Sequence, residues 1–123
     1  KLPQDMKNIL KMYDGYYDIG GLSMFSFLQK NKWNVCEKTE FFRKKISLPK
    51  EYLVLQEGEE SFIVLKTNET LIENTPVFWI GISDVYNLIE NKELEDNPTI
   101  FPSFSDFFEF LLDEEEKMRA ENN

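Results

Sequence analysis

The sequence predicts an α+β domain, and three observations support this fold class. Apolar residues recur at helical spacing near the start of the chain, within residues 3–13. A second helical pattern begins at Ser103, and Ser103 and Asp106 have the spacing of a capping box. Between the two, residues 52–66 hold two segments rich in β-branched and aromatic residues around a turn, which is typical of a β-hairpin. The 123 residues suffice for one hydrophobic core, so we expect residues 1–123 to form a single domain.

The first part of the chain is expected to contain two helices and a strand. Pro3 suits the first position of a helix, and Asp14-Gly15 supplies its end. Residues 21–28 follow a glycine-rich turn and predict a strand with apolar side chains on both faces. Residues 33–45 have helical propensity around a pair of adjacent phenylalanines and predict a short helix.

The second part of the chain is expected to contain a strand, a loop and the last helix. Residues 75–82 predict the strand, with Pro76 at its start, where a missing backbone N–H is tolerated. Residues 83–89 predict a single helical turn, and the acidic residues 90–98 predict a loop. Five apolar residues share the face of the last helix that we expect to dock on the sheet: Phe104, Phe107, Phe108, Leu111 and Leu112. Residues 113–123 are expected to extend past the core as an acidic tail and to fray.

The chain is strongly acidic, with 23 Asp and Glu against 14 Lys and Arg and a formal net charge of −9. A negative surface repels phosphate backbones and anionic lipid, so we expect no direct contact with nucleic acid or membranes. Two interpretations of the charge remain open, simple solubility and steering toward a basic partner. No apolar run approaches the ~20 residues that cross a bilayer, so the cytoplasm is the expected location.

Several kinds of chemistry are excluded by residue types that are missing. The chain contains no histidine, which removes the commonest general base, the catalytic triads and most metal-binding arrangements. Gly20-Gly21 precedes an expected strand, whereas the glycines of a dinucleotide-binding motif precede a helix. We therefore expect no nucleotide-binding site at these glycines. Cys36 is the only cysteine, which excludes an internal disulfide, and we favour a small structural role for it over a reactive thiol. We therefore expect no catalytic residue, no metal and no cofactor.

Five short motifs occur in order along the chain. They are Leu2-Pro3 before the first helix, Tyr13-Asp14-Gly15 after it, Gln56-Glu-Gly-Glu-Glu60 in the hairpin turn, Pro76-Val77 before a strand, and Ser103-Phe104-x-x-Phe107 at the last helix. In this order the chain resembles the SUKH superfamily, the SMI/KNR-like proteins that include bacterial immunity proteins and fungal cell-wall regulators. The resemblance covers nearly the whole chain, although each motif is short.

The chain departs from the family pattern in three places. The amphipathic helix that usually precedes the Leu-Pro step is absent, which suggests that the chain starts after it. The usual Asn-Gly is Asp14-Gly15, and the hairpin turn carries glutamates where the family has more glycine. The last two departures do not contradict the fold of the family. They do put in doubt that the chain shares any pocket conserved in the family.

The resemblance implies an α+β fold with a mixed or antiparallel sheet of about four to six strands, flanked by helices at both chain ends. It also implies no enzymatic activity and, in bacteria, neutralisation of a co-encoded toxin, often a nuclease or deaminase. Our leading hypothesis is therefore an immunity protein, a monomer or weak homodimer, that binds the basic domain of a cognate toxin. The alternative is a regulatory or scaffold interaction module of the cell-wall-regulator type. A third hypothesis, an acid–base enzyme, requires two carboxylates that converge in a cleft.

The expected partner-binding residues lie in two turns, and they are Tyr16, Tyr17, Glu57, Glu59 and Glu60. Tyrosine and charged residues near one another are typical of interface hot spots, and a rigid hairpin loses little entropy on binding. An equal alternative for the tyrosines is that one or both close the core over the first strand. Trp33 and Trp79 are weaker candidates, and we expect Trp79 in the core because it lies inside an apolar strand.

Overall fold

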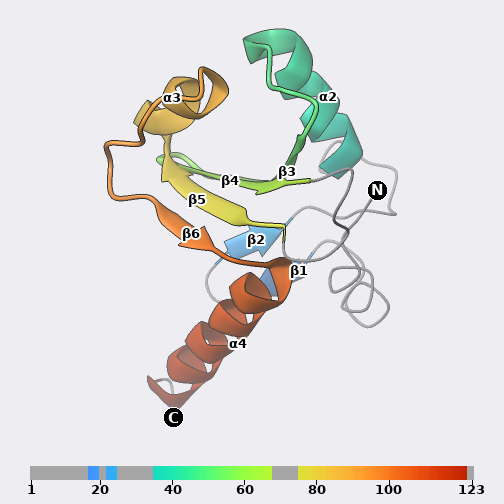
Figure 1. Cartoon of the computed structure of the whole chain (residues 1–123). Helices are drawn as coiled ribbons and strands as arrows, with labels where there is room; N and C mark the ends of the chain where they lie inside the picture. The colour runs from blue at the N-terminus through green and yellow to red at the C-terminus, as the bar shows by residue number, and fades with distance from the viewer. Residues whose placement is uncertain (1–16, 20–21, 25–34, 68–74, 122–123) are drawn as a thin grey trace.

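The computed structural model describes residues 17–19, 22–24, 35–67 and 75–121 (Figure 1). The elements in chain order are β1 Tyr17–Ile19, β2 Leu22–Met24, α2 Val35–Ile46, β3 Tyr52–Glu57, β4 Ser61–Lys66, β5 Val77–Gly81, η1 Ile82–Asp84, α3 Val85–Ile89, β6 Thr99–Phe101 and α4 Phe104–Glu121. The fold class is α+β, as expected, because β3-β4-β5-β6 form a four-stranded antiparallel sheet between α2 and α4 in the chain. Strands β1 and β2 form a separate antiparallel ladder.

Three features expected near the start of the chain lie outside the described residues. They are the helix at residues 3–13, Tyr16 and Trp33. Of the strand expected at residues 21–28, Leu22–Met24 form β2.

The expected elements of the remaining chain are confirmed. Among the described residues two strands are new, β6 and also β1, which lies within the turn expected before residue 21. α2 is the helix expected within residues 33–45, and β3 with β4 is the expected hairpin. β5 lies within the strand expected at residues 75–82, and η1 followed by α3 forms the expected helical turn. β6 was not expected, because three residues between Pro98 and Pro102 are too few to show a pattern. It forms by pairing with β5 at the edge of the sheet.

Each face of the four-stranded sheet has its own hydrophobic core, because successive side chains of a strand point to opposite faces. The face under α4 contributes Leu55, Ile63, Leu65 and Val77 to the first core. The face under α2 and α3 contributes Tyr52, Val54, Phe62, Val64 and Ile80 to the second. Figure 1 shows α2 and α3 on one side of the sheet and α4 on the other. The strands β4 and β5 read as continuous apolar runs because both of their faces are covered.

A β-bulge at Leu55 changes the face that the end of β3 presents. The register of β3 against β4 shifts between Val54 and Gln56, which leaves Leu55 as the extra residue. After the shift, Glu57 pairs with Phe62, a member of the core under α2. Because cross-strand partners point to the same face, the bulge turns Glu57 toward α2 instead of α4.

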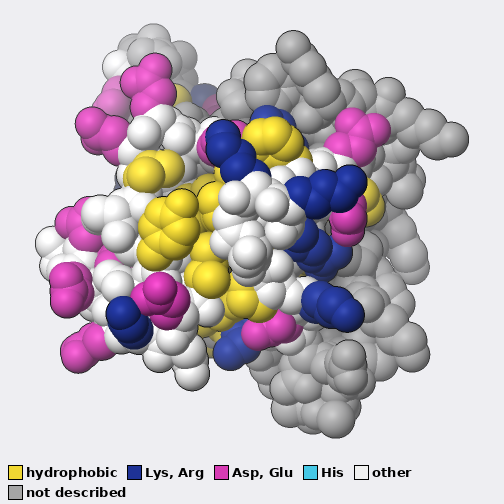
Figure 2. Space-filling view, turned by 90° about the horizontal axis from the view of Figure 1, so that it is seen from above, with side chains coloured by type: hydrophobic (Ala, Val, Ile, Leu, Met, Phe, Trp, Pro, Cys, Tyr) yellow, Lys and Arg dark blue, Asp and Glu magenta, His cyan; other side chains and the backbone are white. Residues whose placement is uncertain are grey.

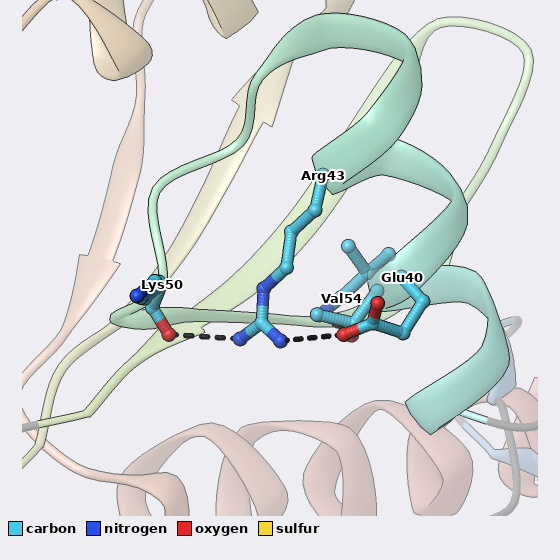
Figure 3. Close-up of polar contacts among 5 residues, drawn as sticks. Glu40, Arg43, Lys50 and Val54 are labelled. Atoms are coloured by element: carbon cyan, nitrogen blue, oxygen red, sulfur yellow. Dashed lines mark hydrogen bonds and ion pairs between the residues drawn. The ribbon is translucent and has the colours of Figure 1, made fainter.

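Polar contacts as well as packing hold α2 on the sheet. The hydroxyl of the buried Thr39 accepts a hydrogen bond of 3.0 Å from the backbone N–H of Val54 in β3. The Arg43 guanidinium donates to the Glu40 carboxylate at 2.9 Å and to the backbone carbonyl of Lys50 at 2.8 Å (Figure 3). These contacts join the helix, the loop after it and the edge strand, so α2 is fixed over β3.

Ser103 and Asp106 cap the start of α4, as their spacing predicts. The Asp106 backbone N–H donates to Ser103 Oγ at 3.2 Å, and the Ser103 hydroxyl donates to the Asp106 carboxylate at 2.8 Å. Four of the five residues expected on the docked face are buried, namely Phe104, Phe107, Phe108 and Leu111. The fifth, Leu112, is 38% exposed, so its expected place on this face is wrong. At 3.6 residues per turn, Leu112 lies on the flank of the helix, roughly 90° from the middle of the buried face.

The expectation that residues 113–123 fray is wrong as far as Glu121, where α4 ends. Glutamate, lysine, arginine and alanine in this segment are good helix formers even without burial. Ion pairs at helical spacing add to this, since Lys117 lies 3.3 Å from Glu114 and Arg119 lies 3.1 Å from a second glutamate. Residues 113–121 are therefore an exposed continuation of the helix, which projects past the sheet in Figure 1.

Candidate partner-binding site

A surface pocket of about 450 Å³ lies at the end of the sheet where β4 begins and β5 ends. Its lining residues are Glu60, Ser61, Trp79, Ile80, Gly81, Asn97, Thr99 and Phe110. Trp79 pairs with Thr99 across the strands and packs against the core under α4, so the pocket opens on the α4 side of the sheet.

Two aromatic side chains form the apolar part of the pocket. The rings of Trp79 and Phe110 meet edge to face, with their centroids 6.1 Å apart. Phe110 is 37% exposed, and Trp79 is partly buried against the core. The expected core position of Trp79 is thus confirmed in part, because the same side chain also lines the pocket. Partly exposed aromatic side chains in a surface depression are typical anchors for a protein partner.

The three hairpin glutamates do not form one cluster. Glu57, turned toward α2 by the bulge, has its carboxylate 3.5 Å from the Lys38 ammonium. Glu60 lines the pocket on the α4 side, and Glu59 is exposed in the turn between them. Glu57 and Glu60 therefore lie on opposite faces, so these two carboxylates do not converge in one cleft.

The two tyrosines expected beside these glutamates are placed only in part. Tyr16 lies outside the described residues. Tyr17 begins β1, where its backbone pairs with Met24, and β1 contacts α4. A role of either tyrosine in partner binding stays a prediction.

A buried carboxylate holds the loop that supplies Asn97 to the pocket. Asp84 accepts hydrogen bonds from the backbone N–H groups of Glu95 at 2.9 Å and Asp96 at 2.8 Å, and from the Asn87 side-chain amide at 3.0 Å. The bond from Glu95, followed by that from Asn87, lowers the pKa of the Asp84 carboxyl below its ordinary value of 3.8. Asp84 thus anchors the loop after α3 to the end of β5.

Gly81 lets the same loop lie close to the strand beside the pocket. A Cβ atom at Gly81 would lie 2.5 Å from Asp96 Oδ2. That carboxylate also accepts a hydrogen bond of 3.2 Å from the Ser83 hydroxyl. The sequence pattern had one signal for this anchor, the polar pair Ser83-Asp84 directly after an apolar strand. It had none for Phe110, whose place in the pocket depends on how α4 crosses the sheet.

Residues 1–113 match the profile of the SMI1/KNR4 family (SUKH-1). The chain belongs to this family. The match confirms the resemblance that the order of motifs indicates, and it covers the sheet and most of α4. The chain matches none of the curated proteins and none of the solved structures with which it was compared. SUKH-1 proteins are typically immunity proteins of polymorphic toxin systems and are generally non-catalytic.

In this SUKH-1 domain the pocket end of the sheet is acidic. The backbone N–H of Ile82 donates to the Glu60 carbonyl at 3.1 Å, which places the hairpin turn beside η1 and its loop. Exposed carboxylates gather there on Glu59, Glu60, Glu95 and Asp96. Among the residues that line the pocket, Glu60 carries the one charge. An aromatic pocket with one carboxylate in its lining and exposed carboxylates on the neighbouring turn and loop suits the binding of a partner with a basic surface.

Other kinds of site are not formed by the part of the SUKH-1 chain that the structure describes. In that part, no group of three or more His, Cys, Asp or Glu residues could hold a metal ion. Among its helices, none has both the length and the apolar composition that a membrane crossing requires. Cys36 is exposed on α2, so it does not pack inside the core.

Proposed function

We propose that this SUKH-1 protein is a non-catalytic immunity protein that binds and neutralises a cognate toxin domain with a basic surface. The observation that supports this most strongly is the pocket at the acidic end of the sheet, where Trp79 and Phe110 lie with Glu60. Family membership supports the same function.

The chemistry of the pocket suits an apolar or cationic side chain that projects from a basic surface. The two aromatic rings offer apolar area and a ring face for a cation, and Glu60 offers a carboxylate beside them. Nucleases and other nucleic-acid-targeting toxins carry basic surfaces that bind phosphate groups. Carboxylates at the pocket would occupy the place of those phosphates and so block access to the toxin's substrate.

Among the hairpin glutamates, Glu60 is the strongest candidate for contact because it lines the pocket. Glu59 follows, since it is exposed beside Glu60. Glu57 is the weakest, because its carboxylate already pairs with a lysine of α2 on the other side of the sheet. Tyr16 and Tyr17 remain proposed contacts, and the proposed place of action is the cytoplasm.

The first test is to search beside the gene for this chain for one that encodes a toxin domain, and to express the two together. Co-expression of the chain should restore the growth of cells that express this toxin, and the two purified proteins should form a tight complex. Absence of both rescue and binding would contradict an immunity function. Weak binding to several unrelated proteins would instead favour the regulatory or scaffold alternative.

Single charge reversals test where the toxin binds. Glu60→Lys should weaken the complex by about 2 kcal/mol or more, because it places a cation against a basic partner. Glu121→Lys changes the net charge equally at the exposed end of α4 and should leave the affinity nearly unchanged. Calorimetric titration with a catalytically inactive toxin measures both values. Equal effects of the two variants would disprove this location for the site and leave the function itself standing.

A further inference from the structure

The face of the sheet under α2 and α3 is incompletely covered. Around its core lie five partly buried or exposed apolar residues, which we call the apolar strip: Ile46, Phe78, Ile89, Leu94 and Ile100. Ile100 is 52% exposed and pairs with Phe78 across the strands, so both side chains belong to this face. Figure 2 shows apolar side chains gathered in the middle of this face. Partly exposed apolar side chains that gather on one face are typical of an interaction surface.

The two sides of the apolar strip carry opposite charge. The basic segment, residues 43–50, contains Arg43, Lys44, Lys45 and Lys50 and no acidic residue. The acidic segment, residues 90–96, contains Glu90, Glu93, Glu95 and Asp96 and a single lysine. In Figure 2, Lys and Arg side chains lie mostly on one side of the apolar strip and Asp and Glu mostly on the other.

Opposite charges on the two sides restrict the partners that fit. A uniformly basic protein surface would be repelled by the basic segment, and nucleic acid would be repelled by the acidic segment. A second copy of the chain offers an acidic segment to the basic one and a basic segment to the acidic one. A two-fold axis that runs along the apolar strip, in the plane of the interface, sets the basic segment of each copy against the acidic segment of the other.

We infer that the chain forms a symmetric homodimer through this face, with the two apolar strips in contact and ion pairs on both sides. The net charge of −9 on each copy opposes association, so the dimer is weak. The local arrangement of charge, more than its total, then decides whether two copies associate. The pocket lies on the α4 side of the sheet, so the dimer leaves it open to a partner.

Charge reversal in the acidic segment distinguishes this dimer from the effect of total charge. Glu90→Lys together with Glu93→Lys changes the net charge by two units per site, from −9 to −5, which by itself favours association. In the inferred dimer, the same change places lysines against the basic segment and raises the dissociation constant by about tenfold or more. The matched control is Glu116→Lys with Glu121→Lys on exposed positions of α4, which should leave the constant unchanged or lower it.

A mixing experiment tests the geometry directly. Lys44→Glu with Lys45→Glu lowers the charge of the basic segment from +4 to 0, whereas Glu90→Lys with Glu93→Lys changes that of the acidic segment from −3 to +1. Each double variant alone should be largely monomeric, because segments of opposite net charge no longer face each other on either side of the strip. An equimolar mixture of the two should form a heterodimer, because opposite charges meet again.

Sedimentation velocity of the unmodified chain and of these variants, at rising micromolar concentrations, gives the result. A chain that stays monomeric throughout overturns the inference. So does a dimer that Glu90→Lys with Glu93→Lys leaves intact, since it would use another surface, and so does a mixture without heterodimers. None of these results depends on whether a toxin binds at the pocket.

Discussion

The two faces of the sheet are stabilised in different ways. On the α4 face, one long helix fills the core with aromatic and leucine side chains, among them Phe107 and Leu111, which are 0% exposed. On the opposite face, two shorter helices cover the sheet, and buried polar groups such as Thr39 and Asp84 hold them and the adjoining loop in place. The stability of the face under α4 therefore comes mainly from closely packed apolar side chains. The stability of the face under α2 and α3 also depends on the hydrogen bonds of buried polar groups.

Two adjacent leucines test the part played by packed volume and give the largest expected effect. Leu111→Ala removes a fully buried side chain from the α4 core and should lower the free energy of unfolding by about 3 kcal/mol. Leu112→Ala removes the same atoms from a flank that is 38% exposed and should cost less than about 1 kcal/mol. Urea unfolding of both variants measures the difference. Similar costs would show that the two leucines are packed alike.

A single hydroxyl tests the polar contribution on the other face. Thr39→Val keeps the shape of the side chain but leaves the backbone N–H of Val54 without its acceptor. We expect the free energy of unfolding to fall by about 2 kcal/mol, since an unsatisfied buried donor loses its hydration without compensation. Thr39→Ser retains a hydroxyl and should recover part of the loss. A serine variant no more stable than the valine variant would point to the methyl group instead.

Asp84 on the same face makes the stability of the folded protein depend on pH. Its pKa is lower in the folded protein than the ordinary value of 3.8, so its contribution to stability is complete above that value and is lost as pH falls through the folded pKa. Asp84→Asn should lower the melting temperature at neutral pH by roughly 4 °C. The gap between the two proteins should close at acid pH. A gap that stays constant from neutral pH to below pH 3.8 would contradict the assignment.

Gly81 should show the smallest effect on stability and a local effect on the pocket. A methyl group at this position displaces the flexible end of Asp96, so Gly81→Ala should cost less than about 1 kcal/mol. The displaced carboxylate should still shift the amide resonances of residues 95–97 in NMR spectra. Unshifted resonances would show that the loop does not rest on Gly81.

The two proposed surfaces lie on different faces of the sheet, and the loop with Glu95 and Asp96 adjoins both of them. The pocket with Trp79 opens beside the well-packed α4 core, and the apolar strip with Ile100 lies on the less covered face. Variants of Glu60 should change toxin affinity without changing the dimer.

Local patterns predicted the elements that depend on neighbours in the chain. The hairpin at residues 52–66 follows from β-branched and aromatic residues around a turn, and α4 follows from its capping box and periodic apolar face. The position of α2 was predicted from two phenylalanines, of which Phe42 is buried and Phe41 is 48% exposed. The fraying of α4 was wrongly expected, because exposure was given more weight than helix propensity in residues 113–121.

The candidate site could be predicted only in part. Glu60 was found because the hairpin turn is visible in the sequence, and it does line a pocket. Trp79 and Phe110 lie 31 positions apart in the chain and meet only when α4 packs on β5. Glu57 and Glu60 lie on opposite faces of the sheet because of a β-bulge, and no local pattern in residues 52–57 predicts this bulge.

The sequence by itself determined the family, the α+β class, the main helices and strands, and the acidity of the chain, because each is encoded by short-range spacing or by composition. The tertiary structure decided which face each side chain occupies, how β6 joins the sheet, and which carboxylate lines the aromatic pocket. These depend on strand register and on packing between distant segments. A shift of one residue in register sends every later side chain of a strand to the opposite face, and here such a shift separates two glutamates of one turn.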